Sequence, residues 1–181
     1  MDTSIQLQKE KIREEMKARR AELCSTPERK RKFDAEIISK LLEMPPVQDA
    51  EVILVYESYK DEVDTHELIG IFHDLGKTVV VPRIESMDQA KMNLQVKSFD
   101  KNSIRSYVEP SAIECVITPG LAFDAKLNRI GFGKGFFDRL FHEVTCPKIG
   151  LAYDFQIVQN VPVDKHDEKL SYIITPTTIY E

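Results

Sequence analysis

The order of apolar and polar positions along the chain predicts helices that alternate with buried strands. Five apolar runs, rich in β-branched residues, are typical of strands covered on both faces and lie at 52–56, 78–81, 115–119, 149–153 and 172–175. Between them, apolar residues recur at helical spacing over 65–76 and 135–144. Alternating strands and helices form βαβ units, so the pattern predicts an α/β fold, a single three-layer Rossmann-like domain with a mainly parallel sheet.

The first 45 residues predict two helices, which we expect to form a helical N-terminal part of one domain over 1–181. Thr26 and Pro27 are a start signal for the second helix, and Met44-Pro45-Pro46 is expected to end it, since proline cannot continue a helix. In the first helix, over 4–24, the apolar stripe is too thin to bury much surface, so we expect it on the domain surface; it consists of Ile5, Ile12, Met16 and Leu23.

Two further expectations concern the middle of the chain. Thr65 can cap the helix that Gly76 closes. The polar stretch 83–91 is typical of a loop, and the alternation over 92–96 is typical of a half-exposed edge strand.

Composition narrows the class of protein. The 181 residues carry 25 basic and 30 acidic side chains, a net charge of −5, which argues against sequence-independent nucleic-acid binding. No apolar run has the roughly 18 residues that span a bilayer, and the start has no secretory signal. The three cysteines predict neither a disulfide framework nor structural zinc. We therefore expect a cytoplasmic protein that binds neither nucleic acid nor membrane.

The segment 120–139 carries the most specific chemistry. Glycines at 131, 133 and 135 let successive backbone N–H groups face a phosphate, and the helix after them adds its N-terminal dipole. Arg129 and Lys134 add positive charge, and Asp138 could ligate Mg²⁺ or only compensate the helix dipole. The spacing is neither GxxxxGK[ST] nor GxGxxG, so the glycines alone are equally typical of a tight turn into a helix.

Four ordered motifs resemble those of the 5-formyltetrahydrofolate cyclo-ligase family. Its signature is similar to residues 120–138, which read GLAFDAKLNRIGFGKGFFD. Lys9-x3-Arg13, the stretch 61–65 (DEVDT) and the stretch 161–167 (VPVDKHD) resemble its other motifs. The chain departs from the family at Leu127, where glycine is usual, and we expect Asn128 to take the left-handed conformation instead. It also has Phe136-Phe137 where the family favours two tyrosines, so ring stacking remains without a hydroxyl.

The resemblance implies conversion of 5-formyltetrahydrofolate and MgATP to 5,10-methenyltetrahydrofolate, ADP and phosphate. It implies that Lys134 and Arg129 are catalytic and that ATP is bound by Lys9, Arg13, Arg129, Ile130, Gly131, Phe132, Gly133, Lys134, Gly135, Phe136 and Phe137. It further implies Mg²⁺ ligation by Asp138 and Asp167. Candidates for the folate side are Tyr56, Glu62, Phe132 and Phe136, because a buried carboxylate can make two parallel hydrogen bonds with a pterin edge.

Each of these roles has a plainer alternative. Lys9 and Arg13 share a helix face that could simply be solvated, Asp167 could be a surface turn carboxylate, and Glu62 could be a loop residue. At the level of function, the alternatives are another phosphate-ligand enzyme, such as a sugar-phosphate isomerase or CoA-transferase-like protein, and a non-catalytic nucleotide-binding module. His66, His73 and His142 are predicted to be ordinary helix residues. The sequence is compatible with a monomer or a homodimer.

Overall fold

A seven-stranded sheet organises the chain, of which the computed structural model describes residues 3–86, 91–97, 106–165 and 167–181. The strand order is β3-β2-β1-β4-β7-β8-β9. Neighbours from β2 to β8 pair in parallel, whereas β3 and β9 pair antiparallel at the two edges. The bounds are β1 Val52–Val55, β2 Thr78–Ser86, β3 Lys91–Val96, β4 Cys115–Thr118, β7 Lys148–Leu151, β8 Tyr172–Ile174 and β9 Ile179–Tyr180.

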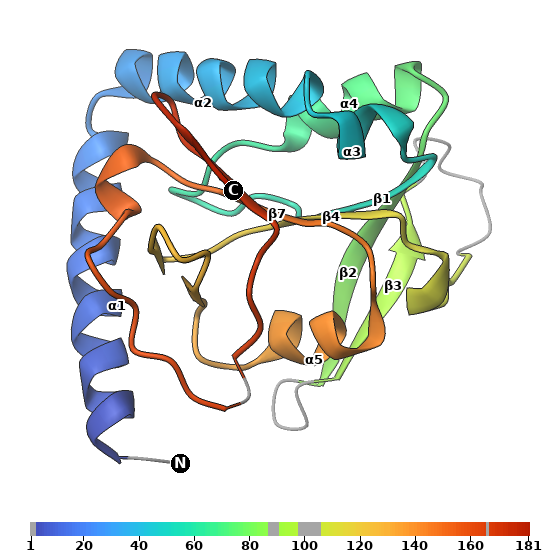
Figure 1. The fold of residues 1–181 in the computed structure, drawn as a ribbon. Coiled ribbons are helices and arrows are strands. Elements are labelled where there is room, and N and C mark those ends of the chain that lie inside the picture. Colours follow the sequence, from blue (N-terminus) through green and yellow to red (C-terminus); the bar gives the residue numbers. More distant parts are fainter. Residues whose placement is uncertain (1–2, 87–90, 98–105, 166) are drawn as a thin grey trace.

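Helices cover both faces of this sheet, which confirms the predicted three-layer α/β fold (Figure 1). One face packs against α2 Pro27–Leu42, α3 Pro45–Asp49 and α4 His66–Asp74, and the other against α5 Phe136–Glu143. Each face has its own apolar core, because alternate residues of a strand point to opposite sides; Ile53 and Val55 belong to one core, Leu54 to the other. Two short 3-10 turns, Pro110–Ala112 and Asp154–Gln156, complete the connections.

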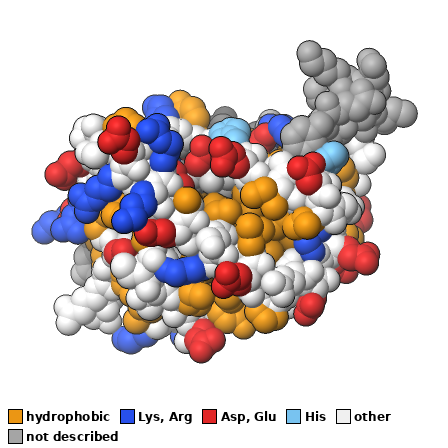
Figure 2. Space-filling view, turned by 90° about the horizontal axis from the view of Figure 1, so that it is seen from above, with side chains coloured by type: hydrophobic (Ala, Val, Ile, Leu, Met, Phe, Trp, Pro, Cys, Tyr) orange, Lys and Arg blue, Asp and Glu red, His pale blue; other side chains and the backbone are white. Residues whose placement is uncertain are grey.

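The outer face of the α2–α4 layer is seen from above in Figure 2. Basic side chains gather at the left, over the corner between the first two helices, and apolar side chains gather right of the centre. The start of α2 carries the basic run Arg29-Lys30-Arg31-Lys32. No helix of the described residues is both long enough and apolar enough to cross a membrane.

Helix α1, Thr3–Cys24, lies beside the sheet (Figure 1). We expected it to bury little surface, and that expectation is wrong, because five of its residues are buried. Three of its five buried residues are cations; the five are Lys9, Arg13, Met16, Arg20 and Leu23. Their spacing puts them on one face, so the helix does pack against the domain, but through charged side chains. Its apolar part meets Leu121 and Ile130 in a small third core.

A two-stranded hairpin, β5 Ala122–Phe123 and β6 Arg129–Ile130, was not predicted. It directly precedes residues 131–135, which we call the glycine segment. Asp124 is buried at its turn, where its carboxylate accepts from the backbone N–H groups of Lys126, Asn128 and Val161. These hydrogen bonds outweigh its desolvation, so the pKa of Asp124 lies below its ordinary value. The expectation for Asn128 is wrong: Leu127 itself takes the left-handed conformation, with φ 68°.

Other local expectations divide between confirmed and corrected. Gly76, with φ 76°, follows the C-terminus of α4 as predicted. Thr65 occupies the N-cap position, but its hydroxyl donates to the Tyr56 carbonyl at 2.6 Å and makes no capping hydrogen bond. The predicted loop over 83–91 is wrong where the structure describes it, because β2 continues to Ser86 and β3 begins at Lys91; residues 87–90 lie outside the described residues. Pro45 does not only follow α2 but begins α3, since proline suits the first helical turn.

Candidate active site

A cavity of about 1190 Å³ opens at the carboxyl ends of the parallel strands. Residues that come after β1 and β4 contribute to it, as expected of ligand sites in open α/β sheets. The structure brings together here every site residue expected from the sequence except one: Lys9, Arg13, Tyr56, Glu62, Arg129, Gly131, Phe132, Gly133, Lys134, Gly135, Phe136, Phe137, Asp138 and Asp167.

Ile130 is the exception, and its side chain is no candidate for nucleotide contact. It is 1% exposed and packs with Met16 and Leu121 in the core beneath α1. Its carbonyl accepts the Leu121 N–H at 2.7 Å. The alternation of side chains along β6 explains the difference, because Arg129 and Ile130 must point to opposite faces.

The three glycines of the glycine segment are required for two different reasons, backbone conformation and space. Gly133 and Gly135 have φ of 91° and 68°, a region that other L-residues rarely adopt. At Gly131 the reason is space, because a Cβ there would lie 2.8 Å from the Arg129 guanidinium. The segment therefore lies directly against the arginine and leads into the N-terminus of α5.

Helix α1 supplies two buried cations to the same wall. The Lys9 ammonium donates to the Asp167 carboxylate, an ion pair between residues far apart in the chain. Arg13 donates from Nε to the Gly131 carbonyl at 2.9 Å and pairs with Glu10 at 2.8 Å. Arg13 is 8% exposed and its guanidinium lies under Gly133. The reading of this face as simply solvated is therefore wrong.

Arg129 is enclosed in the floor of the cavity. It donates to the Pro119 carbonyl at 3.2 Å and to Asp138 at 2.8 Å, and it lies over the rings of Phe137 and Phe141. Burial lowers its pKa and Asp138 opposes that shift, so the guanidinium stays paired. Among the described residues, its Nε is one of two buried side-chain atoms without a hydrogen-bond partner.

Two residues of the glycine segment reach outward from the wall. Phe132 is 53% exposed and Lys134 is also exposed. Within the described part of the chain no ion pair holds the Lys134 ammonium, in contrast to Lys9 and Arg129. An unneutralised ammonium at the mouth of the cavity, on a flexible stem, is free to meet an anion.

The loop after β1 forms the opposite wall, and it carries a buried carboxylate. Glu62 is 8% exposed and accepts the Tyr59 N–H at 2.8 Å. Burial raises its pKa, while that hydrogen bond and Arg20 act against the shift. Tyr56 lines the cavity, but its hydroxyl donates to the Val63 carbonyl at 2.9 Å, and burial raises its pKa. Its hydroxyl therefore fastens the loop, and its ring is the part available to a ligand.

An ion pair that the sequence reasoning missed joins the two walls. Arg20, 3% exposed on α1, pairs with Asp61 beside Glu62 and lies 5.7 Å from the centre of the Phe132 ring. Its Nε is the other buried atom without a partner in the described residues. A signal was present, since Lys9, Arg13, Met16 and Arg20 recur at helical spacing on one face.

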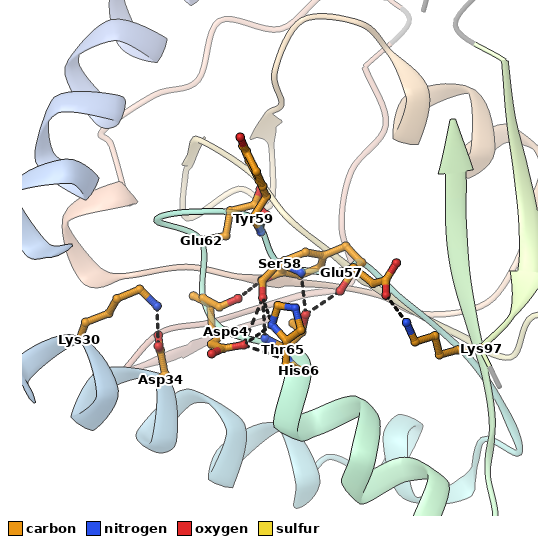
Figure 3. A network of polar contacts seen from close by, with 12 residues as sticks. Lys30, Asp34, Glu57, Ser58, Tyr59, Glu62, Asp64, Thr65, His66 and Lys97 are labelled. Carbon is orange, nitrogen blue, oxygen red and sulfur yellow. Dashed lines mark hydrogen bonds and ion pairs between the residues drawn. The ribbon is translucent and has the colours of Figure 1, made fainter. Parts of the chain in front are cut away.

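The polar network after β1 contains a serine, a histidine and an aspartate, yet its geometry is that of a helix start (Figure 3). Ser58 Oγ and Asp64 Oδ1 both contact the same ring nitrogen of His66, Nδ1, at 3.0 and 2.8 Å. A catalytic triad needs the two opposite ring nitrogens. Asp64 also accepts the His66 N–H, and these hydrogen bonds outweigh desolvation and lower its pKa. This agrees with the expectation that His66 is not catalytic.

His142 was also expected to be an ordinary helix residue, but it lines the cavity. Its Nδ1 lies 3.1 Å from the Glu168 carboxylate. Among the described residues, this contact with Glu168 is the one ion pair of His142, and it indicates no catalytic role.

Fold and cavity together define the class: an α/β protein with a cation-lined cavity at the carboxyl edge of a parallel sheet. Residues 5–176 match the 5-formyltetrahydrofolate cyclo-ligase family, and the chain belongs to this family of enzymes. The expected family is thereby confirmed, and the match favours it over the isomerase-like, transferase-like and non-catalytic alternatives. The match spans both the first helix and the stretch 161–167, so both lie within the family's common region.

Relatives and solved structures agree with this assignment. The chain is 30% identical to the 5-formyltetrahydrofolate cyclo-ligase of Escherichia coli K12, over 86% of this chain and 94% of that protein. It is 32% identical to the enzyme of the same name from Mycoplasma genitalium, over 92% and 96%. The 5,10-methenyltetrahydrofolate synthetases of Aquifex aeolicus and Mycoplasma pneumoniae superpose with TM-scores of 0.81 and 0.80, at 26% and 29% identity. They cover 96% and 97% of this chain, and the matches extend over 92% and 99% of theirs.

Proposed function

We propose that the chain cyclises 5-formyltetrahydrofolate to 5,10-methenyltetrahydrofolate and couples this step to conversion of ATP to ADP and phosphate. A formamide is a poor electrophile, and its oxygen is a poor leaving group. Transfer of the γ-phosphoryl group to the formyl oxygen removes both obstacles. N10 then attacks the activated carbon, phosphate leaves with the former formyl oxygen, and N10 loses its proton. The observation that carries the proposal is the cavity in which a cationic wall faces a buried carboxylate.

The proposed reaction needs no covalent nucleophile from the protein. It needs residues that position the two substrates and stabilise the negative charge on the transferring phosphoryl group. Lys9, Arg13 and Arg129 are held in place by their contacts, so they offer a preorganised anion site. Lys134 is unneutralised and can accompany the transferring phosphoryl group. Phe136 and Phe137 at the start of α5 offer rings but no hydroxyl to the nucleotide.

Magnesium fits this site as a companion of the phosphates. In the described residues no group of three or more His, Cys, Asp or Glu could form a protein-only metal cage. Mg²⁺ held beside phosphates uses only one or two protein carboxylates and several waters. Asp138 and Asp167 line the cavity and would hold it, although each is paired with a cation in this structure. When bound, Mg²⁺ would neutralise charge on the transferring group.

Glu62 is the residue that we propose for the pterin. Its Oε2 accepts one backbone N–H, which orients the carboxylate towards the cavity and leaves acceptor capacity for an aminopyrimidine edge. The aromatic rings of Tyr56, Phe132 and Phe136 would then supply stacking surface. Since both ends of the chain contribute to the cavity, we propose that residues 1–181 work as one domain.

The test is direct, because 5,10-methenyltetrahydrofolate absorbs in the near ultraviolet, away from its precursor. Purified, folded protein should produce that band only when 5-formyltetrahydrofolate, ATP and Mg²⁺ are all present. Omission of each component in turn is the control. A folded protein that yields no band, or yields it without ATP, would overturn the proposal.

A further inference from the structure

Arg20 on α1 is a buried cation that contacts three separate segments of the chain. Its guanidinium pairs with the Asp61 carboxylate in the loop after β1. It also donates to the Gly120 carbonyl after β4, at 3.4 Å, and lies 5.7 Å from the centre of the Phe132 ring in the glycine segment. Arg20 therefore connects the loop that carries Glu62 to the glycine segment.

The side chain reaches both walls of the cavity from behind. Phe132 and Glu62 line the cavity. In the described part of the chain, Arg20 and Asp61 do not. Asp61 directly precedes Glu62, so the ion pair holds the backbone that carries the Glu62 carboxylate. Phe132 belongs to the glycine segment, so the position of its ring follows the position of that segment. Any action of Arg20 on a ligand must pass through these two neighbours.

Hydrogen bonds within the loop after β1 fix its own shape. The Tyr56 hydroxyl donates to the Val63 carbonyl, and the Tyr59 N–H donates to Glu62. These contacts do not reach the glycine segment, whereas those of Arg20 do. The charge of Arg20 also acts on the loop. Burial raises the pKa of Glu62, and Arg20 opposes that rise, so it favours the ionised carboxylate.

We propose that Arg20 is a positioning residue that couples the binding of the two substrates. Phosphates held by the backbone N–H groups of the glycine segment fix the Phe132 ring against Arg20. Arg20 in turn holds Asp61, and with it the loop that carries Glu62. The folate then meets a loop that is already ordered, so its binding costs less conformational entropy. By linkage, bound folate must favour the nucleotide by the same factor. This inference rests on the proposed function and adds to it a preference for the complex with both substrates.

Binding titrations measure this coupling without turnover. The dissociation constant of 5-formyltetrahydrofolate is determined by calorimetry, alone and with saturating Mg²⁺ and an ATP analogue. The analogue has nitrogen in the β,γ-bridge and cannot transfer its phosphoryl group. In wild type the analogue should tighten folate binding by about 5- to 10-fold, and folate should tighten binding of the analogue equally. Arg20→Met keeps an apolar stem but removes the charge, so this factor should fall to near 1.

Two further variants separate coupling from folding. Arg19→Met makes the same change one residue earlier, at an exposed arginine that pairs with Glu15, and should keep the wild-type factor. Asp61→Asn keeps the size of the side chain but removes the ion pair, and should lower the factor even if Arg20→Met folds poorly. Because Asp61 does not line the described cavity, this change should alter the affinity for each ligand alone by less than it alters the coupling.

The outcomes distinguish the inference from the proposed function. A wild type that binds the two ligands independently overturns the inference and leaves the proposed function intact. If Arg20→Met and Asp61→Asn keep the wild-type factor, the ion pair is only structural and the inference is again wrong. A wild type that binds both ligands with coupling but forms no methenyl product overturns the proposed function alone. A wild type that binds no folate overturns both.

Discussion

Helices α1 and α4 bury their inner faces by opposite means. Helix α4 buries Leu68, Ile69 and Phe72, whereas α1 buries three cations beside Met16 and Leu23. Removing apolar surface from water is favourable, so α4 stabilises the fold directly. Removing charge from water is unfavourable unless partners compensate, and each α1 cation has one. The face of α4 serves stability, and the face of α1 serves the cavity.

The largest expected effect tests the stabilising side of this comparison. Phe72 is 0% exposed, so Phe72→Ala loses buried area and leaves a cavity, at a cost of about 3–5 kcal/mol in the free energy of unfolding. Urea unfolding measures it. The fraction that remains folded should keep its specific activity, and a loss of activity per folded molecule would break the comparison.

Arg13→Ala should reduce activity strongly and stability only slightly, the reverse of Phe72→Ala. We expect turnover to fall by about 10²-fold or more, because a preorganised phosphate contact is lost. The free energy of unfolding should fall by only roughly 1–2 kcal/mol, for the hydrogen bond to Gly131. Lys17→Ala is the matched control, since Lys17 lies on the same helix in an exposed pair with Glu14. Equal turnover in the two variants would remove Arg13 from the site.

Loss of Arg20 should reduce both stability and activity, because its ion pair with Asp61 joins α1 to the loop after β1. Arg20→Ala leaves Asp61 without its cation, and we expect a loss of roughly 2–3 kcal/mol in stability, since Asp61 is partly reachable by water. Arg20→Met keeps the stem packed and should recover part of the stability but not the activity. If Arg20→Met restores both, the pair is only structural.

Glu62→Gln should weaken folate binding while it stabilises the protein. Burial raises the pKa of Glu62, so the unfolded chain ionises first and stability falls as pH rises from about 4.5 through the folded-state pKa. Glutamine does not ionise, so the stability of the variant should not decrease with pH for this reason. Its melting temperature at neutral pH should therefore exceed that of wild type. Its KM for the folate should rise about 10-fold or more. A melting temperature that keeps the wild-type pH dependence would contradict the burial argument.

The smallest effect concerns Leu127, away from both helices. Its left-handed backbone favours glycine, so Leu127→Gly should be more stable than Leu127→Ala by about 1 kcal/mol, the reverse of the usual order. Wild type gains packing from the leucine side chain against the second core. Thermal unfolding of the two variants under matched conditions measures the difference.

Periodicity made most of the sheet predictable from the sequence, whereas burial of charge was missed. The strands at 52–56, 78–81 and 115–119 were readable because apolar β-branched runs need no tertiary information. The stripe on α1 was misread because only its apolar positions were counted, although Lys9, Arg13 and Arg20 recur on the same face as Met16. Short elements such as β9 and the β5–β6 hairpin carry too few residues for a pattern, and Ile130 was assigned by its position within a motif rather than by its face.

The ion pair between Lys9 and Asp167 joins residues 158 positions apart, and Arg13 contacts Gly131 across 118. Such separations make loop closure slow, because much chain must be ordered before the contact forms. During synthesis α1 leaves the ribosome long before its partners exist. Until then, Arg13 and Lys17 have Glu10 and Glu14 of the same helix as partners. A chain that ends before Asp167 therefore lacks one of the contacts that hold α1 against the cavity.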